Sequence, residues 1–210
     1  MSRTKVLNKT QIIQCAYNIA KEKGRKAITI REIGSRLGKS TAPIYTQFSS
    51  IDEIMEDLVV YFKDLLSTST KQQSSGNKFL DIGVGFLSFV MENKLIFNDF
   101  FISTDGPRFD FTRDESFYLK QMKQSPFLSV LDDERLRRIL EDMQIYTYGL
   151  AIMICANIGP SDDLSYYQKK LELSGNSLIG YHMYSSGKYE LAIQNMVKKI
   201  SEQVDIKEVY

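Results

Sequence analysis

The segment from Ser40 to Phe48 carries the side chains whose types and spacing best suit a chemical task. At roughly 100° per residue, Ile44 and Phe48 point to one side of a helix, and Ala42 and Thr46 point to the other. The outward side is small and polar, and it holds none of the carboxylates that a nucleic acid duplex would repel. Pro43 and Tyr45 flank this outward side.

A helix between Thr29 and Gly38 precedes this face and would hold it in place. Thr29 and Glu32 have the spacing of a capping box, which marks a helix start. One side of this helix is apolar and carries Ile30, Ile33 and Leu37. Gly38 follows the last apolar residue, where a helix end favours the left-handed conformation that glycine adopts without penalty.

The second helix is short. Ser40 is expected to cap it, and Pro43 lies in its first turn, where backbone N–H groups have no intrahelical partner. Ser50 and Glu53 form another capping box, so a third helix begins almost at once. Two short helices joined by a glycine turn are typical of a helix-turn-helix, whose second helix enters the DNA major groove by its N-terminal end. Any packed pair of helices can also carry such a turn.

This order of elements, with a short helix that ends in Ile-Tyr-x-x-Phe and an acidic helix start soon after, resembles the TetR family of transcriptional repressors. The resemblance covers residues 10–58, through Thr29, Ile33, Leu37, Gly38, Ser40, Ile44, Tyr45, Phe48, Glu53 and Ile54. The chain departs from the family pattern at Gly34, Lys39 and Ala42-Pro43. It also has Ile51 where the family places a lysine that touches a phosphate, and the sequence leaves open whether Lys39 replaces that contact.

The resemblance implies an all-α fold with two parts. Residues 1–50 would form an N-terminal three-helix helix-turn-helix head, and residues 51–210 a larger helical ligand-binding and dimerisation body. It also implies that Tyr45 donates to a phosphate and that Arg31 reaches a base edge or a phosphate, with pairing to Glu32 or solvent as the alternative for Arg31. The full set of candidate DNA-binding residues is Arg31, Lys39, Ser40, Thr41, Ala42, Tyr45, Thr46 and Gln47.

Charge is distributed unevenly along the chain. The net charge is +1, but residues 1–50 hold ten Lys and Arg against Glu22 and Glu32, which gives +8. The other 17 basic and 24 acidic residues give −7. A basic head on an acidic body would orient the molecule on a polyanion, and a solvated surface with accidental asymmetry is the alternative. The first basic residues would follow phosphates or form a disordered tail, and they are Arg3, Lys5 and Lys9.

Composition and periodicity indicate a helical, cytoplasmic protein. The 210 residues are 43% apolar with four prolines and no strand-like alternation, so one sizeable core or two modest ones can form. Cys15 and Cys155 stand in separate apolar helical stripes, which favours reduced thiols in a cytoplasmic protein. No signal peptide is visible, and the longest apolar run, Leu150–Ile158, is too short to span a bilayer, so no membrane partner is expected.

The helical periodicity predicts a long linking helix and a series of body helices. The linking helix runs from Asp52 to about Gln72 and would act as a lever between head and body, with the first break at 67–77 and a loop at 103–113. Asp132-Asp133-Glu134 opens the longest body helix, which ends near Gly159-Pro160. The first helix is expected to start at Asn8 or Thr10 and to end at Gly24, and further helices are expected at 78–92, 114–123, 132–158, 162–185 and 187–204.

Two of these helices, at about 132–158 and 162–185, carry more apolar surface than one small body can hide. Their apolar residues include Leu136, Ile139, Leu140, Met143, Ile154, Leu164, Tyr167, Leu171, Leu178 and Ile179. The TetR family uses this pair of helices as a four-helix dimer interface, so the resemblance implies a homodimer. Burial within the monomer is the alternative.

The resemblance also implies a site for a small-molecule effector between the lever helix and the helices that follow. Flexible methionines among rigid aromatic rings would suit a hydrophobic or flat molecule, and Gly83 and Gly85 would leave room beside the rings. The candidate lining consists of Phe62, Phe86, Phe89, Phe97, Phe101, Tyr118, Met122, Met143 and Tyr146. An aromatic stripe at helical spacing is also what an ordinary core contains.

Residues for catalysis, metal binding or cofactor binding follow no familiar pattern. The one histidine, His182, is expected at the surface or at an interface near a helix end. The chain lacks His/Cys metal spacing, a glycine phosphate loop and Gly-x-Ser-x-Gly, so no enzyme activity, metal or cofactor is expected. The sequence therefore predicts a TetR-like repressor that binds a palindromic double-stranded DNA operator as a homodimer and releases it when an effector binds. An all-helical enzyme, or a lipid or small-molecule carrier with a basic surface, is the alternative.

Overall fold

The computed structural model describes residues 7–105, 115–159 and 163–205, which form helices with no β-strand among them. The α-helices are α1 (Lys9–Lys23), α2 (Ile30–Leu37), α3 (Ala42–Tyr45), α4 (Ile51–Lys71), α5 (Lys78–Glu92), α6 (Lys94–Phe97), α7 (Glu115–Met122), α8 (Asp133–Ala156), α9 (Leu164–Ser186) and α10 (Tyr189–Asp205). Short 3-10 turns lie at η1 (Arg25–Ala27) and η3 (Leu128–Val130), and a π-helical turn lies at η2 (Asn98–Ile102). The all-helical fold class is confirmed for these residues.

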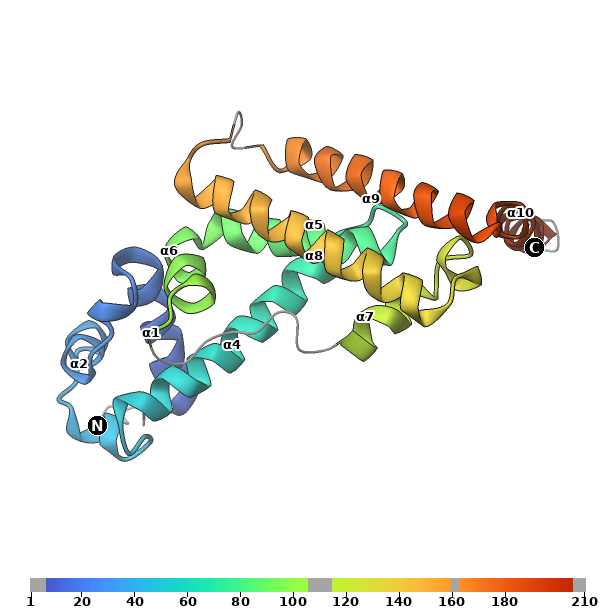
Figure 1. Ribbon diagram of the computed structural model, residues 1–210. Coiled ribbons are helices and arrows are strands. Elements are labelled where there is room, and N and C mark those ends of the chain that lie inside the picture. The colour runs from blue at the N-terminus through green and yellow to red at the C-terminus, as the bar shows by residue number, and fades with distance from the viewer. Residues whose placement is uncertain (1–6, 106–114, 160–162, 206–210) are drawn as a thin grey trace.

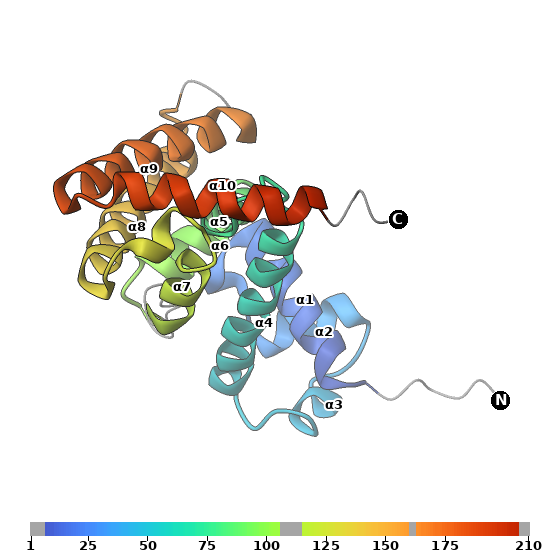
Figure 2. The ribbon, with the colours of Figure 1, turned by 90° about the vertical axis from the view of Figure 1, so that its right-hand side faces the viewer.

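The helices form an elongated molecule in which α4 joins a small N-terminal group to a larger bundle (Figure 1). Helix α1 packs against α2, α4 and α6, and the bundle contains α5, α8 and α9 in mutual contact. Helices α8 and α9 are antiparallel, since Arg135 Nη1 near the start of α8 donates to Ser185 Oγ at the end of α9 over 3.1 Å. Helix α10 lies across the end of this bundle (Figure 2).

Most helix ends coincide with the capping residues that the sequence predicts. Asn8 caps α1 in a full capping box with Gln11. Thr29 caps α2, and Gly38 ends it in the left-handed conformation. Ser50 caps α4 by accepting from the Glu53 N–H over 3.2 Å, and α5 has the predicted bounds of 78–92.

Three helix ends differ from the prediction. Ser40 does not cap α3: the N-cap is Thr41, whose backbone is already helical and whose side chain makes no capping bond. Helix α4 continues to Lys71, so the break predicted at 67–77 begins later. Helix α8 ends at Ala156, short of Gly159, because Asn157 takes the left-handed conformation that asparagine tolerates. The loop predicted at 103–113 lies mostly outside the described residues.

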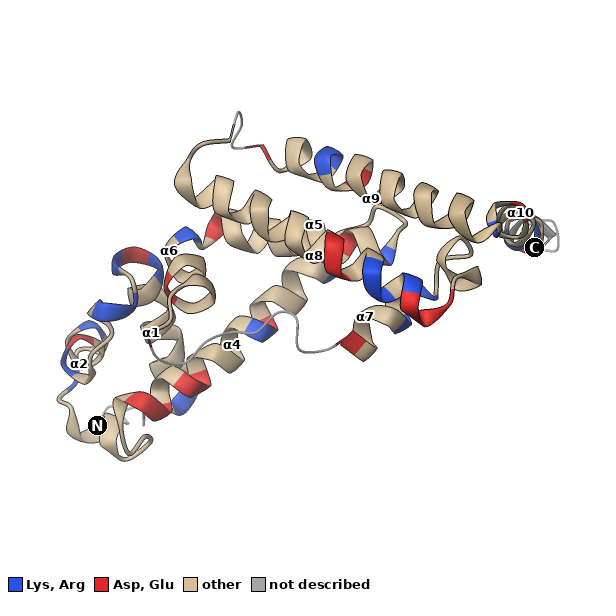
Figure 3. Cartoon of the chain, in the orientation of Figure 1, with Lys and Arg blue, Asp and Glu red and all other residues tan. Residues whose placement is uncertain are grey.

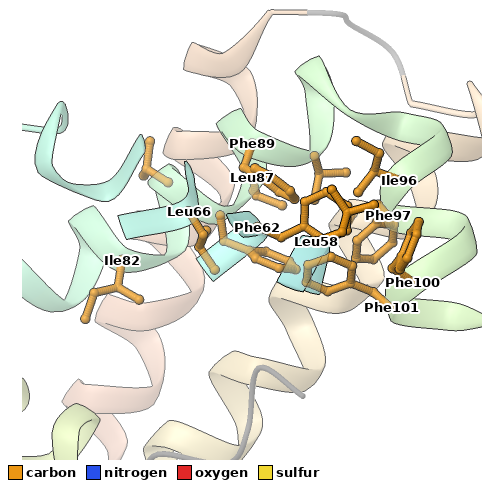
Figure 4. Close-up of a cluster of buried hydrophobic side chains, with 14 of the residues drawn as sticks. Leu58, Phe62, Leu66, Ile82, Leu87, Phe89, Ile96, Phe97, Phe100 and Phe101 are labelled. Carbon is orange, nitrogen blue, oxygen red and sulfur yellow. The ribbon is translucent and has the colours of Figure 1, made fainter. Parts of the chain in front are cut away.

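One cluster of buried apolar residues includes side chains from α1 to α10. Phe62 of α4 packs edge to face against Phe100 of η2 and Tyr17 of α1, with ring centroids 4.9 Å and 6.5 Å away. Figure 4 shows that side chains from α4, α5, α6 and η2 meet in one cluster. The first three helices therefore share their packing with the larger bundle.

Polar contacts from Tyr17 and Arg25 join the N-terminal group to the segment 93–102. Tyr17 donates its hydroxyl to Asn93 Oδ1 over 2.8 Å, and the Arg25 backbone N–H donates to Asp99 Oδ2 over 2.7 Å. Gly24 has a φ of 78°, and a Cβ there would lie 2.8 Å from the same Asp99 oxygen, so glycine is required for both reasons. The Arg25 guanidinium also stacks 4.9 Å above the Phe100 ring.

Gly85 lets α5 approach the backbone of α4. A Cβ on Gly85 would lie 2.5 Å from Thr70 Cα and 2.7 Å from Thr70 N. The room that the sequence predicts beside Gly85 is therefore filled by the neighbouring helix. At Gly83 a Cβ would meet Leu171 Cδ1 at 3.2 Å, but Gly83 also lines a cavity next to α9, so some of the predicted room is present there.

Helices α8 and α9 bury most of the apolar residues that the sequence assigns to a dimer interface, and this assignment is wrong for them. The residues buried within the monomer are Leu136, Ile139, Leu140, Met143, Ile154, Tyr167 and Leu171. Leu164, Leu178 and Ile179 are half-buried. Both faces of these helices carry apolar residues, so periodicity alone does not tell which face packs on α5. The alternative, burial within the monomer, is therefore correct for the seven buried residues.

His182 is buried within the monomer, so the prediction of a surface or interface position is also wrong. The side chain and backbone of His182 together are 6% exposed, and the Nδ1 atom has no hydrogen-bond partner among the described residues. Burial lowers the pKa of the imidazole, and the positive charges of Arg135 and Arg138 add to this effect although nearby aspartates oppose it. The ring is therefore neutral at pH 7 and packs as a core side chain.

Cys15 is a buried free thiol and Cys155 a half-buried one. Burial raises the pKa of both thiols, which makes them less reactive. Their predicted role as reduced packing residues agrees with this placement. No helix in the described part of the chain is both long and apolar enough to cross a bilayer.

Candidate functional site

The turn between α2 and α3 is held by backbone hydrogen bonds and by two glycines. Gly38 has φ 62° and ψ 36°, its N–H donates to Ser35 O, and the Lys39 N–H donates to Gly34 O over 2.9 Å. This pair of bonds is a Schellman motif. A Cβ on Gly34 would lie 3.0 Å from Lys39 O and 3.6 Å from Ile44 Cδ1. The glycine at position 34, a departure from the TetR pattern, thus lets α3 pack closely on α2.

The helix that the sequence predicts through Phe48 ends at Tyr45. Helix α3 and the turn that follows it bury one side and expose the other, as the periodicity predicts. Ile44 and Phe48 are buried in the core. Ala42, Tyr45 and Thr46 are exposed, and Tyr45 keeps 56% of its surface accessible. The exposed side therefore presents a small residue, a hydroxyl and a phenol to solvent.

Ion pairs neutralise both acidic residues of the first 50 positions. Glu32 Oε1 accepts from Lys23 at 2.9 Å and from Arg36 at 3.2 Å, and Glu22 pairs with Arg36 at 2.8 Å. These bonds hold the pKa of both carboxyl groups below the usual value. Glu32 is therefore engaged with other cations, and the alternative pairing of Arg31 with Glu32 does not occur.

The candidate contact residues around α3 lie at or near the surface. Arg31, Lys39 and Ser40 are exposed, while Thr41 and Gln47 are half-buried. Arg31 and Lys39 form no ion pair within the described part of the chain. Figure 3 shows both basic and acidic residues on α1 and α2, whereas α3 contains no charged residue. The arrangement is an uncharged, hydrogen-bonding helix with two unpaired cations close to it in sequence.

Lys9, a candidate for contact with phosphates, is engaged within the protein. Its Nζ pairs with Glu53 Oε1 at 3.1 Å and lies 4.5 Å above the Phe48 ring. Ile51, where the family has its phosphate-contacting lysine, is half-buried against the core. Lys39 is therefore the exposed cation next to α3 in sequence. The candidates Arg3 and Lys5 lie outside the described residues.

Glu53 ties the start of α4 to the segment that follows α3. Its Oε2 accepts from the Ser49 N–H at 2.7 Å and from the Ser49 hydroxyl at 2.9 Å. The Ser49 N–H, the Lys9 ammonium and the Ser49 hydroxyl, in that order, lower the pKa of Glu53 to about 2. The carboxylate thus fixes how α3 leads into α4.

Acidification is expected to destabilise the protein through Glu53. Because the folded-state pKa lies below the usual value of 4.5, the carboxylate's contribution is complete above that value and is lost as the pH falls through about 2. The gap in urea midpoint between wild type and Glu53→Gln should be constant above about pH 5 and close toward about pH 2. Lys9→Met removes one of the partners of Glu53, so the difference in urea midpoint between wild type and Lys9→Met should be smaller than that for Glu53→Gln. A gap that does not vary with pH would contradict the assignment.

A cavity of about 210 Å³ lies among α5, α7, α8 and α9. Its walls come from the start of α5 and the loop before it, from Tyr118 of α7, from the middle of α8 and from α9. Of the ligand-binding candidates, Tyr118 and Met143 line this cavity. The space is thus bounded by α5 rather than by the lever helix α4.

The other ligand-binding candidates are packed elsewhere. Phe86 lies 5.8 Å from Phe97 and 6.1 Å from Phe101, and Phe89 lies 5.9 Å from Phe101, all between ring centroids. These rings and Phe62 are buried, and Figure 4 shows several of them in the core cluster. They do not line the cavity, and neither do two more candidates, buried Met122 and half-buried Tyr146.

Gln144 and Gly175 line the cavity and were not predicted from the sequence. The Nε2 of Gln144 is buried and has no hydrogen-bond partner among the described residues. Gly175 is buried within α9 and faces Met143. Two signals point to them: an amide side chain directly after Met143, and a glycine in the middle of an apolar helix, where it costs helix stability.

Comparisons with known proteins add no family to this description, since no protein-family model and no curated protein matches the chain. The TetR resemblance therefore rests on the residues of the segment 10–58 alone. In the described ranges, no group of three or more His, Cys, Asp or Glu side chains is placed to hold a metal ion.

Proposed function

We propose that the protein is a TetR-like transcriptional repressor that binds a palindromic DNA operator as a homodimer. In this proposal α2, the Gly38 turn and α3 form a helix-turn-helix, and α3 enters the major groove by its N-terminal end. The observation that carries the proposal is the two-sided α3. Ile44 and Phe48 anchor it in the core, while its other side is exposed and holds no carboxylate.

The charges around α3 support a phosphate-bearing partner. Exposed Arg31 and Lys39 have no acidic partner within the described residues, so their charges are available to DNA. Phosphate contacts from these cations and from the Tyr45 hydroxyl would position the helix. Polar groups at Ser40, Thr41 and Gln47 would then face base edges or phosphates.

A second copy of the chain would cover apolar residues that α8 and α9 leave exposed. Ile145 and Ile152, seven residues apart on α8, are 67% and 47% exposed. Helix α9 adds Leu173, Tyr181 and Tyr184, at 56%, 67% and 86%. Exposed apolar surface rich in aromatic rings is typical of protein interfaces. A twofold dimer would offer two α3 helices to major grooves about 34 Å apart.

An effector in the cavity would release the operator by changing the separation of the two α3 helices. Helix α5 forms one wall of the cavity and packs along α4. Helix α4 in turn begins at Ile51, shortly after α3, and Glu53 fixes that junction. A ligand that favours one position of α5 would therefore shift the population of α3 spacings.

Selection from a random double-stranded DNA library tests the proposal. We expect the retained fragments to share a palindromic motif, with an affinity that falls steeply as salt increases, because phosphate contacts release counterions. Tyr45→Ala should weaken this binding roughly tenfold through loss of a hydrogen bond to a charged phosphate. Tyr189→Ala is the matched control, since Tyr189 of α10 is 51% exposed, and it should bind like wild type. If no motif is enriched at any salt concentration, the repressor function is excluded and a carrier or enzyme is favoured.

A further inference from the structure

We propose that α3 and the turn that follows it recognise thymine methyl groups in the DNA major groove, through Ala42 and Thr46. The inference rests on the proposed function and deepens it, because it names the feature of the operator that these residues select. Of the four bases, thymine alone carries a methyl group in the groove, and alanine and threonine side chains make apolar contact with it.

Ala42 and Thr46 offer apolar groups to a partner. Both residues are exposed, and they lie roughly 40° apart around the helix axis. The side chain of Ala42 is a methyl group. The Thr46 hydroxyl donates to Pro43 O over 2.7 Å, so its one proton is used within the protein. The methyl group, which is the other substituent on the Thr46 Cβ, remains for contact with a base.

The side chains that usually read the other bases are missing from α3. Arginine and lysine read guanine, asparagine and glutamine read adenine, and aspartate and glutamate accept from cytosine. Helix α3 has the sequence Ala-Pro-Ile-Tyr and contains none of these residues. Gln47 follows the helix but is half-buried. In the proposed function Tyr45, which is also exposed, contacts a phosphate. The base contact left to Ala42 and Thr46 is therefore an apolar one.

Helix α3 is held firmly enough for such a short-range contact. Carbon atoms attract one another most strongly at about 3.5–4.0 Å, so a methyl contact requires a fixed position on both sides. On the opposite side of α3, Ile44 and Phe48 are 0% and 2% exposed. Ile44 also lies against α2 at Gly34. The hydrogen bond to Pro43 O restricts rotation of the Thr46 side chain.

Deoxyuridine substitution in the selected operator tests the proposal on the DNA side. Deoxyuridine pairs like thymidine and differs from it only by the missing methyl group. Replacing a contacted thymine should weaken binding of the full-length wild type by about fourfold per half-site, because one methyl group is lost from an apolar contact. A 5-methylcytosine·guanine pair at the same position should bind about fourfold more tightly than cytosine·guanine, since only the former has the methyl group.

Three variants test it on the protein side by fluorescence anisotropy titration with both operators. Thr46→Ser removes the methyl group and keeps the hydroxyl, so it should bind the thymine and deoxyuridine operators equally at one contacted position. Thr46→Val keeps a methyl group and should retain the preference for thymine. Thr68→Ser is the matched control, because Thr68 of α4 is also exposed and donates its hydroxyl to a backbone carbonyl, Asp64 O, over 2.8 Å. It should retain the full preference.

Three results would overturn the inference and leave operator binding standing: a selected motif without thymine in its half-sites, equal affinity for the thymine and deoxyuridine operators at every position, or an unchanged preference in Thr46→Ser. Circular dichroism establishes that each variant is folded, and the base substitutions test the methyl contact with the wild type alone. If the library yields no motif at all, the repressor function itself is overturned, and this inference with it.

Discussion

Gly85→Ala is expected to destabilise the protein by about 3 kcal/mol. The added Cβ would lie 2.5 Å from Thr70 Cα and 2.7 Å from Thr70 N. Both atoms belong to the backbone of α4, which cannot rotate away as a side chain can. Helices α4 and α5 would have to move apart, and the packing of Phe62 and Leu66 between them would loosen. The better helix propensity of alanine, about 1 kcal/mol, offsets only part of this cost.

Gly175→Ala is the matched control, with an effect of opposite sign. Gly175 is also a buried helical glycine, but its added Cβ would meet Met143 at 3.6 Å. The protein should therefore gain up to about 1 kcal/mol. Urea denaturation followed by circular dichroism measures both variants, with unchanged m values as the check on two-state unfolding. Equal stabilities of the two variants would contradict the close approach of α4 and α5.

A double variant with glutamate at Ile145 and Leu173 is expected to lose at least about 100-fold in operator affinity. These residues are 67% and 56% exposed, so the monomer should fold with little loss of stability. In the proposed dimer the new carboxylates would be desolvated against apolar side chains, which favours dissociation. A monomer binds only one half-site of the operator. It therefore lacks the gain in affinity that comes from binding two half-sites at once, which is a factor of roughly 10² to 10⁴.

Analytical ultracentrifugation and operator titration measure these two effects separately. Val60→Glu is the control, because Val60 is an exposed apolar residue of α4 with 56% accessibility, outside the α8 and α9 surface. It should remain dimeric and bind with wild-type affinity. A double variant that stays dimeric would contradict the assigned interface. A monomeric variant with full affinity would instead contradict a palindromic operator.

Helix ends were the features most accurately predicted from the sequence, because capping is decided within a few residues. Asn8, Thr29 and Ser50 all accept the expected backbone hydrogen bonds. Ser40 is the exception, and the reason is local. The Schellman hydrogen bonds of the preceding turn and the close packing at Gly34 determine the backbone conformation at the start of α3. In that conformation Thr41, not Ser40, is the N-cap residue.

The inward faces of the body helices could not be predicted, because apolar residues occur on both sides. Met143 and Ile145 on α8 are similar in hydrophobicity, yet the first is buried and the second exposed. The choice between them depends on where α5 and α9 lie. The aromatic stripe was ambiguous for the same reason, since a closed core and a ligand cavity have the same spacing. The cavity itself arises from the relative position of four helices, which no single segment specifies.

The contact between Asp99 and Arg25 has a consequence for how related sequences can diverge. The Asp99 carboxylate accepts from the main-chain N–H of residue 25, so any amino acid there except proline keeps that hydrogen bond and loses the guanidinium contacts. Position 24 does not tolerate other amino acids, because any side chain would collide with Asp99 and strain the backbone. Related sequences should therefore retain Gly24 and Asp99 together, while the residue at position 25 varies.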